Sequence, residues 1–332
     1  MIGISTLQKT LLAKASTRLH KGLTDSISSC CISKFRLFLA FCYFIQVDFK
    51  SPQVDIVLAF LEFLVQNNTS YSSLSNTVSA LKSKFSMYGL STSHFEDRRI
   101  FYYLKSVKIN RPLLPRPKPI IDIPLLEKIV LICDTMYQGV IFKAAYLTAF
   151  FSFLRISNLV PHSIATFLHM KQLARADVIF SPPGALLVIK WSKTMQSKDK
   201  IKILKIPSLP NSILCPVKAL QVLLHRTPGS NNYPLFQINN NGHWVPLTDS
   251  RLRKHFSLIL KNLNLSHSGY TFHTFRRSGA SFAFNSNVSI QNIREHGTWS
   301  STCVYKYIAS NSIASDEVAL SFELALQHTS TP

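Results

Sequence analysis

The chain has 332 residues, 46% of them hydrophobic, and carries 37 Lys and Arg against 16 Asp and Glu, a formal net charge of +21. This composition supports a sizeable core, argues against wholesale disorder, and suits one large domain or two. The charge predicts a polyanionic partner, because cations that neutralise phosphates release condensed counterions. A basic protein that binds anions without specificity would have the same charge.

Glycine and cysteine usage narrows the chemistry. The chain has only 10 glycines and contains neither GxGxxG nor GxxxxGK[ST], the two common phosphate-cradling strings. Its 6 cysteines show no CxxC pair and no Cys/His spacing suited to zinc. We therefore expect no nucleotide cofactor, no metal site, and free thiols in a reducing compartment.

Two apolar runs, 37–47 and 144–154, resemble membrane segments only superficially. Each spans about eleven residues, whereas a membrane-spanning helix needs about twenty. Both are interpreted as buried core helices, and no membrane partner is expected.

In chain order, residues 1–24 are an N-terminal extension and residues 25–108 show the period of amphipathic helices. Ser51 followed by Pro52 predicts a helix start, and Gly89 predicts a helix end. The phenylalanine-rich runs are interpreted as core. The segment 25–108 is therefore expected to be a small all-α domain with Lys and Arg on its polar faces.

The next stretch, "KINRPLLPRPKPIIDIP" (108–124), holds four basic residues and five prolines. Proline cannot continue a helix, so this composition predicts an extended, semi-rigid linker over 109–123. Residues 124–312 are expected to form a second domain.

The second domain is predicted to be mainly helical. "PLLEKIVLICDTM" and "QGVIFKAAYLTAFFSFLRISNLV" indicate buried helices, and further helices start near Pro216 and Thr248. The stretch 181–207 differs, because a Pro-Gly turn and period-2 alternation indicate a β-hairpin. The fold class is thus mainly α with a small antiparallel β-sheet (α+β), followed by a C-terminal helix or tail over 313–332 with a plausible cap at Ser315.

Several cations are placed where they could bind an anion. His273 and Arg276 are three residues apart, so they share a helix face, beside free backbone N–H groups if they lie in a first turn. Arg155 follows an aromatic run that reads as buried, and its guanidinium therefore needs a partner such as a phosphate. Lys193 lies on the predicted hairpin. Each of these residues taken alone is typical of an ordinary surface or helix-end side chain.

Their order along the chain is more specific. An arginine, a hairpin lysine, H-x-x-R, a Gly and Trp, and a tyrosine occur in "FFSFLRISNLVPHS", "KWSKTMQ", "TFHTFRRSGAS" and "EHGTWSSTCVYKYI". In this set, over about residues 25–315, the sequence resembles the tyrosine recombinase (phage-type integrase) family. The wording is most similar to the recombinases of DIRS-type retroelements and Cryptons.

The resemblance implies a fold and a reaction. Residues 25–108 would be a helical core-binding (SAM-like) domain and 124–312 the catalytic domain, together forming a C-shaped clamp on double-stranded DNA. A tyrosine would attack a backbone phosphate, giving a 3′-phosphotyrosine and a free 5′-hydroxyl without metal or cofactor. Arg155 and Arg276 would bind the phosphate oxygens, Lys193 would protonate the leaving oxygen, and His273 would act as acid, base or hydrogen-bond donor.

The chain departs from the family pattern in two places. Asn158 stands where relatives often have an acidic residue, and we expect it to orient its neighbours. His296 and Gly297 occur in reversed order, which leaves the sixth active-site position to Trp299 or His296, with Trp299 favoured.

The reversal also leaves two tyrosines as candidates for the nucleophile. Counting nine residues from His296 leads to Tyr305, and counting ten from Gly297 leads to Tyr307. Glycine should mark the backbone turn before the last helix, so Tyr307 is the favoured nucleophile.

The resemblance predicts site-specific recombination or integration of a mobile element, by a homo-oligomer (dimer or tetramer) on DNA in the nucleus. A catalytically inactive, domesticated DNA-binding protein of the same fold and a type IB topoisomerase-like enzyme are the alternatives. Lys190 and Lys198 are fallback candidates for the hairpin lysine. The remaining histidines show no metal spacing and are expected on the surface or in loops: His162, His169, His243, His255 and His267.

Overall fold

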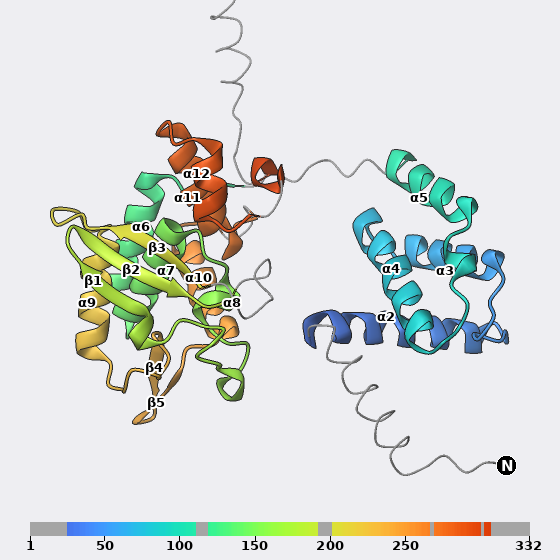
Figure 1. Ribbon diagram of the computed structural model, residues 1–332, viewed down its shortest axis with the longest axis horizontal. Helices are drawn as coiled ribbons and strands as arrows, with labels where there is room; N and C mark the ends of the chain where they lie inside the picture. The colour runs from blue at the N-terminus through green and yellow to red at the C-terminus, as the bar shows by residue number, and fades with distance from the viewer. Residues whose placement is uncertain (1–24, 111–118, 192–200, 266–268, 300–301, 307–332) are drawn as a thin grey trace, which may run out of the picture. The chain divides into compact units, whose positions relative to one another are not determined.

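The computed structural model describes residues 25–110, 119–191, 201–265, 269–299 and 302–306. They belong to two compact units, Met1–Pro115 and Arg116–Pro332 (Figure 1). The last residues of the predicted linker are attached to the second unit. The backbone N–H of Ile121, which is buried, donates to Ser278 Oγ at 2.8 Å, and the Tyr270 hydroxyl donates to the Ile120 carbonyl at 3.2 Å. The chain is therefore fastened to the second unit before its first helix begins.

The described elements of the first unit are all helical, as the sequence period predicts: α2 (Asp25–Phe44), α3 (Val54–Gln66), α4 (Tyr71–Met87), the 3-10 helix η1 (Ser93–Phe95) and α5 (Arg98–Asn110). Aromatic rings form much of the core between α2, α3 and α4. The fully buried Phe38 ring meets Phe60 at a centroid distance of 5.2 Å and Phe85 at 6.1 Å, both edge-on. Edge-on contact is a favoured geometry for aromatic pairs, so these phenylalanines are core residues as expected.

The ends of these helices test the local signals. Gly89 follows α4 with φ +69°, which confirms it as a helix end. The predicted start at Ser51 and Pro52 is wrong, because α3 begins at Val54 after a Gln53 cap. The run 37–47 is also only partly buried, since Phe44 at the end of α2 is 84% exposed.

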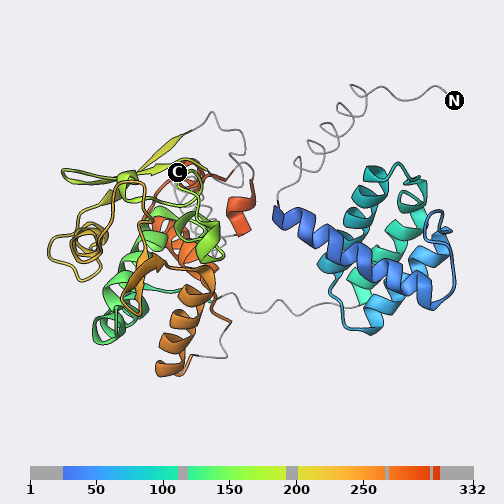
Figure 2. The same cartoon turned by 90° about the horizontal axis from the view of Figure 1, so that it is seen from below.

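The second unit is built around α7 (Gly139–Ser152), which is buried on nearly all sides. In Figure 1 a three-stranded sheet lies in front of this helix, and in Figure 2 the sheet runs along one edge of the unit. Its other described helices are α6 (Ile123–Thr135), α8 (Ile156–Leu159), η2 (Ile164–Thr166), η3 (Arg175–Asp177), α9 (Pro216–Arg226), α10 (Asp249–Asn262), α11 (His273–Asn285), α12 (Ile290–His296) and η4 (Thr302–Lys306).

The sheet contains the predicted hairpin and one strand more. β1 (Val178–Ser181), β2 (Gly184–Ile189) and β3 (Lys202–Pro207) pair antiparallel in that order. Leu187 lies opposite Val178 on one side and Leu204 on the other, and this row faces the core. The β2–β3 hairpin is thus confirmed, while β1 was not predicted because only four residues form it.

A second hairpin, β4 (Gln237–Asn240) with β5 (His243–Pro246), was also not predicted. Its turn is Asn241-Gly242, with φ values of +52° and +87°. Asn-Gly is a strong signal for such a turn, so this hairpin could have been predicted from the sequence.

The fold class is therefore mainly helical with small antiparallel sheets, as predicted. Within the described ranges, no helix is long and apolar enough to cross a membrane.

A glycine sets the distance between α11 and α7. A Cβ atom on Gly279 would lie 2.1 Å from the Phe150 carbonyl oxygen, a backbone atom inside α7. Since helix backbone cannot easily yield, only glycine permits this approach, and the first turn of α11 is thereby brought to the end of α7.

We expect Gly279→Ala to lower the free energy of unfolding of the second unit by about 1–3 kcal/mol, the usual cost of overpacking. All 3 tryptophans belong to this unit, so urea denaturation followed by tryptophan fluorescence reports on it alone. Gly242→Asn is the control, because nothing lies within 4 Å of its Cβ position and asparagine tolerates a positive φ. An unchanged midpoint in Gly279→Ala would contradict this close approach.

His255 corrects the expectation that the remaining histidines lie on the surface or in loops. It belongs to α10 and is 7% exposed, with its ring stacked on Phe142 at 3.6 Å and its Nδ1 in a 2.8 Å hydrogen bond with the Tyr146 hydroxyl. Burial lowers the pKa of His255 to about 4.

The stability of the second unit should fall as the pH drops from about 6.5 toward about 4, by up to about 3 kcal/mol from His255. Between these two pH values His255 is protonated in the unfolded state but not in the folded state, so a falling pH favours unfolding. His255→Gln should flatten the dependence measured by urea denaturation at pH 7.5 and 5. The same substitution at the exposed His243 should not, and equal slopes for both variants would refute the assignment.

Candidate functional site

The site is organised around Arg276, in the first turn of α11. Its side chain is 1% exposed. Nη1 donates to the Phe153 carbonyl, Nη2 donates to the Gly297 carbonyl at 2.6 Å, and the guanidinium carbon lies 3.9 Å from the centre of the Trp299 ring. A buried cation is tolerated only when hydrogen bonds and polarisable neighbours replace its water. Arg276 therefore joins the end of α7, α11 and the loop after α12.

Phe153 turns the chain at the end of α7. It has φ +51°, a left-handed conformation that is uncommon for a residue other than glycine. This turn ends the helix, directs the Phe153 carbonyl to Arg276, and leads to Arg155 two residues later.

Arg155 immediately precedes α8 and is half-buried. Its Nη1 is buried and makes no hydrogen bond to any residue that the structure describes. Such a donor carries a desolvation cost that an anion would relieve. One turn on, the buried Asn158 donates from Nδ2 to the Trp191 carbonyl at 2.6 Å, which ties α8 to the end of the β2 strand.

His273 begins α11 and faces the same group of cations. Desolvation by the surrounding atoms, followed by the charges of Arg276, Arg155 and Arg253, lowers the pKa of His273 to about 4, although the residue as a whole is exposed. His273 is therefore neutral near pH 7 and can accept a proton. Arg253, on α10 and ion-paired with Asp249, was not predicted because no local pattern links it to the others.

The two candidates for the sixth position both lie beside Arg276 but make different contacts. His296 donates from Nε2 to the Phe151 carbonyl at 3.0 Å and meets the Phe153 ring edge-on at 4.7 Å. Burial lowers the pKa of His296, and the Phe151 carbonyl partly offsets this. Trp299 is 4% exposed and contacts the guanidinium of Arg276 directly.

Two of the predicted residues, Lys193 and Tyr307, lie outside the described residues. One described segment ends at Trp191, shortly before Lys193, and another ends at Lys306, just before Tyr307. Tyr305 belongs to η4 and is 59% exposed, while the preceding Val304 is buried in a small apolar cluster with Trp299. The residue before Tyr305 therefore packs in the same cluster as Trp299, which contacts Arg276.

Of the fallback lysines, Lys190 is engaged elsewhere. Its Nζ lies 2.6 Å from Asp177 Oδ1, and it also donates to the His169 carbonyl at 3.2 Å. Lys198 lies outside the described residues.

Lys202, which sequence reasoning did not select, is the described lysine that interacts with His296. It precedes Leu204 and Ile206 in the row of β3 that faces inward. Burial lowers the pKa of Lys202, and Glu295 partly offsets this. The alternation of β3 could have indicated its direction, but not the neighbour that it meets.

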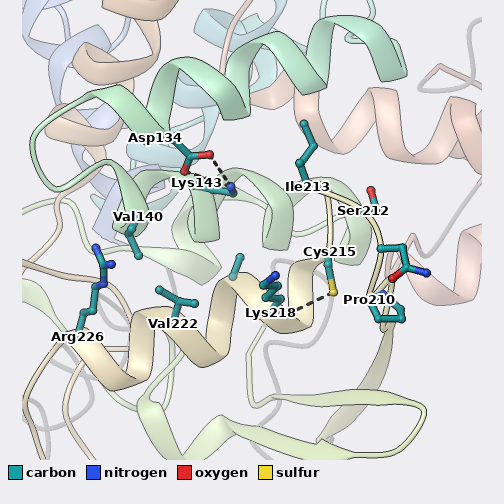
Figure 3. A pocket seen from close by; sticks show the side chains of 12 residues that line it. Asp134, Val140, Lys143, Pro210, Ser212, Ile213, Cys215, Lys218, Val222 and Arg226 are labelled. Carbon is teal, nitrogen blue, oxygen red and sulfur yellow. Dashed lines mark hydrogen bonds and ion pairs between the residues drawn. The ribbon is translucent and has the colours of Figure 1, made fainter.

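Two of the pockets formed by the described residues lie in this unit. One of about 410 Å³ lies behind the site and is mostly apolar, with Phe153, Gly279, Phe282, Ile293 and His296 among its lining residues. The other, of about 420 Å³, lies between α7 and α9 and holds the Asp134–Lys143 ion pair (Figure 3). That second pocket contains none of the predicted site residues. Among the described side chains, no group of three His, Cys, Asp or Glu could hold a metal ion.

No protein-family model matches the chain, and no curated protein matches it in sequence. Solved structures do match. The Tn1549 transposon integrase in complex with transposon right end DNA aligns with a TM-score of 0.61 at 15% identity, covering 93% of this chain and 99% of that one. A lambda integrase dimer bound to a COC′ core site aligns at 0.60 and 15% identity, covering 90% and 76%.

The XerH site-specific recombinase bound to its difH substrate, in a pre-cleavage complex, aligns at 0.56 and 15% identity, covering 86% and 76%. At such identities the likeness concerns the fold. The chain thus has the fold of DNA-bound tyrosine recombinases and integrases.

Proposed function

We propose that this protein cuts and rejoins strands of double-stranded DNA through a 3′-phosphotyrosine intermediate. The proposal rests on Arg155, whose buried Nη1 makes no hydrogen bond to any described residue. Arg155 belongs to a group of cations, including Arg276, whose charges act on the neutral His273. An anion bound beside Arg155 would accept from this Nη1 and would be attracted by the neighbouring positive charges. The net charge of +21 and the DNA in the matching structures support a DNA backbone phosphate as that anion.

The proposed cleavage step involves Tyr307, His273 and Lys193. The hydroxyl oxygen of Tyr307 attacks phosphorus, a tyrosine–phosphate bond forms, and the bond from phosphorus to the 5′-oxygen breaks. His273, neutral at pH 7, accepts the tyrosine proton, and Lys193 donates a proton to the leaving 5′-oxygen. Attack by a 5′-hydroxyl, from the same or a second strand, reverses the steps and releases the tyrosine.

Arg155 and Arg276 stabilise the charge that develops on the non-bridging oxygens. Donors that are oriented before the reaction are worth about 2.7–4 kcal/mol each, or a factor of about 10²–10³ in rate. Trp299 completes this arrangement through its contact with Arg276, with His296 as the alternative at the sixth position.

The biological role proposed is site-specific recombination or integration of a mobile element, by a homo-oligomer acting on paired DNA sites in the nucleus. The likeness to DIRS-type and Crypton recombinases is part of this proposal. A DNA-binding protein without catalysis and a type IB topoisomerase-like enzyme would share the fold, so the experiment below must separate all three.

The full chain should form a covalent adduct with DNA. The probe is a set of nicked duplexes with randomised arms, in which cleavage next to the nick releases a short fragment and traps the protein; adducts are recovered in SDS and sequenced. Tyr307→Phe should abolish the adduct, and the matched control Tyr305→Phe should retain it. Arg155→Gln should slow adduct formation by about 10²–10³-fold.

Each other reading predicts a different result. DNA binding without any adduct would indicate the inactive protein, and an adduct that survives Tyr307→Phe but not Tyr305→Phe would move the nucleophile to Tyr305. Efficient relaxation of supercoiled plasmid without a recovered consensus sequence would indicate the topoisomerase-like enzyme.

A further inference from the structure

Gly297, at the end of α12, is a position where only a hydrogen atom fits. Its φ is −80°, which any residue adopts, so the backbone conformation does not require glycine. A Cβ atom there would lie 1.8 Å from Cζ3 and 2.2 Å from Cε3 of the Trp299 ring. The constraint is therefore the close approach of the indole, and not the turn that the sequence suggested. The left-handed residue of this turn is Thr298, with φ +56°.

The backbone at this point has little freedom to move away. Three successive N–H groups donate into α12: Gly297 to Ile293 at 2.9 Å, Thr298 to Glu295 at 3.1 Å, and Trp299 to Arg294 at 3.0 Å. These bonds fold the chain back so that the indole covers Gly297. A side chain at 297 would therefore displace the indole rather than the backbone.

Gly297 and the indole that packs against it both contact Arg276. The Gly297 carbonyl accepts from Nη2 at 2.6 Å, and the Trp299 ring lies 3.9 Å from the guanidinium carbon. The indole thus lies against both the Gly297 backbone and the Arg276 guanidinium. Moving the indole would remove one of the contacts that orient the Arg276 guanidinium.

We propose that Gly297 is a positioning residue: it lets Trp299 pack closely against Arg276 and so holds the guanidinium in its reactive orientation before DNA binds. The inference rests on the proposed function. Displacement of about 1 Å at a reacting group can cost a factor of about 10², so a single methyl group at 297 should affect the rate far more than DNA affinity.

The test uses the full chain in a Trp191→Phe/Trp244→Phe background, where Trp299 is the sole tryptophan. Gly297→Ala should shift Trp299 emission to the red and increase its quenching by acrylamide, because the ring leaves a site where it is 4% exposed. On the recovered DNA, adduct formation should slow by about 30-fold or more, while Kd changes by less than about 3-fold.

Two further variants separate positioning from general damage. Trp299→His removes the benzo ring that would meet the new methyl group, so adding Gly297→Ala to it should cause little further loss. Gly242→Ala places a methyl group at φ +87°, far from these contacts in sequence, and loses stability without changing Trp299 emission.

Unchanged Trp299 emission in Gly297→Ala would overturn the inference, and so would a red shift with full cleavage activity. Equal losses from Gly297→Ala in the wild-type and Trp299→His backgrounds would do the same, because the methyl group would then act without the indole. If the wild-type chain cleaves no DNA, the proposed function fails, and the emission of Trp299 still decides whether Gly297 holds the indole.

Discussion

The burial of the Arg276 guanidinium is the constraint on which the rest of the second unit's site depends. Removing a cation from water is costly, and here the backbone carbonyls of Phe153 and Gly297 and the face of Trp299 offset that cost. These partners come from the end of α7, and from the turn after α12. All of them must be in place together, so the cation fixes the relative positions of three segments as well as its own.

The surrounding fold brings these segments within reach. Gly279 lets α11 approach the backbone of α7, and the left-handed Phe153 ends α7 so that its carbonyl meets the guanidinium. The same turn sends the chain to Arg155. An uncommon backbone conformation next to a candidate catalytic residue is typical of sites where strain is maintained by the packing around it.

The electrostatics follow from this crowding of cations. Desolvation, and after it the charges of Arg276, Arg155 and Arg253, lower the pKa of His273, which is consequently neutral in the folded protein near pH 7. Like charges gathered close together are unfavourable for folding but would suit a phosphate, whose oxygens can accept from several donors. For the proposed cleavage reaction, donors that folding has already oriented would need no reorganisation when a phosphate binds.

Local patterns in the sequence determined much of this protein. The helical period predicted the helices of the first unit and the main helices of the second, and alternation revealed the β2–β3 hairpin. The spacing of His273 and Arg276 placed them on one helix face, and the aromatic run before Arg155 indicated a cation that needs a partner. All of these signals act within about a turn or two of the residue concerned, which is why sequence alone could supply them.

Only the tertiary structure decided what these side chains meet. The bond from Arg276 to Phe153 spans 123 residues, and that from Tyr146 to His255 spans 109. No period or cap signals such contacts, so the burial of His255 and the approach of Arg253 and Lys202 could not be predicted. The role of Gly297 differed for the same reason: the sequence marked it as a turn, whereas the packing of an indole against a buried guanidinium is what leaves room only for a hydrogen atom.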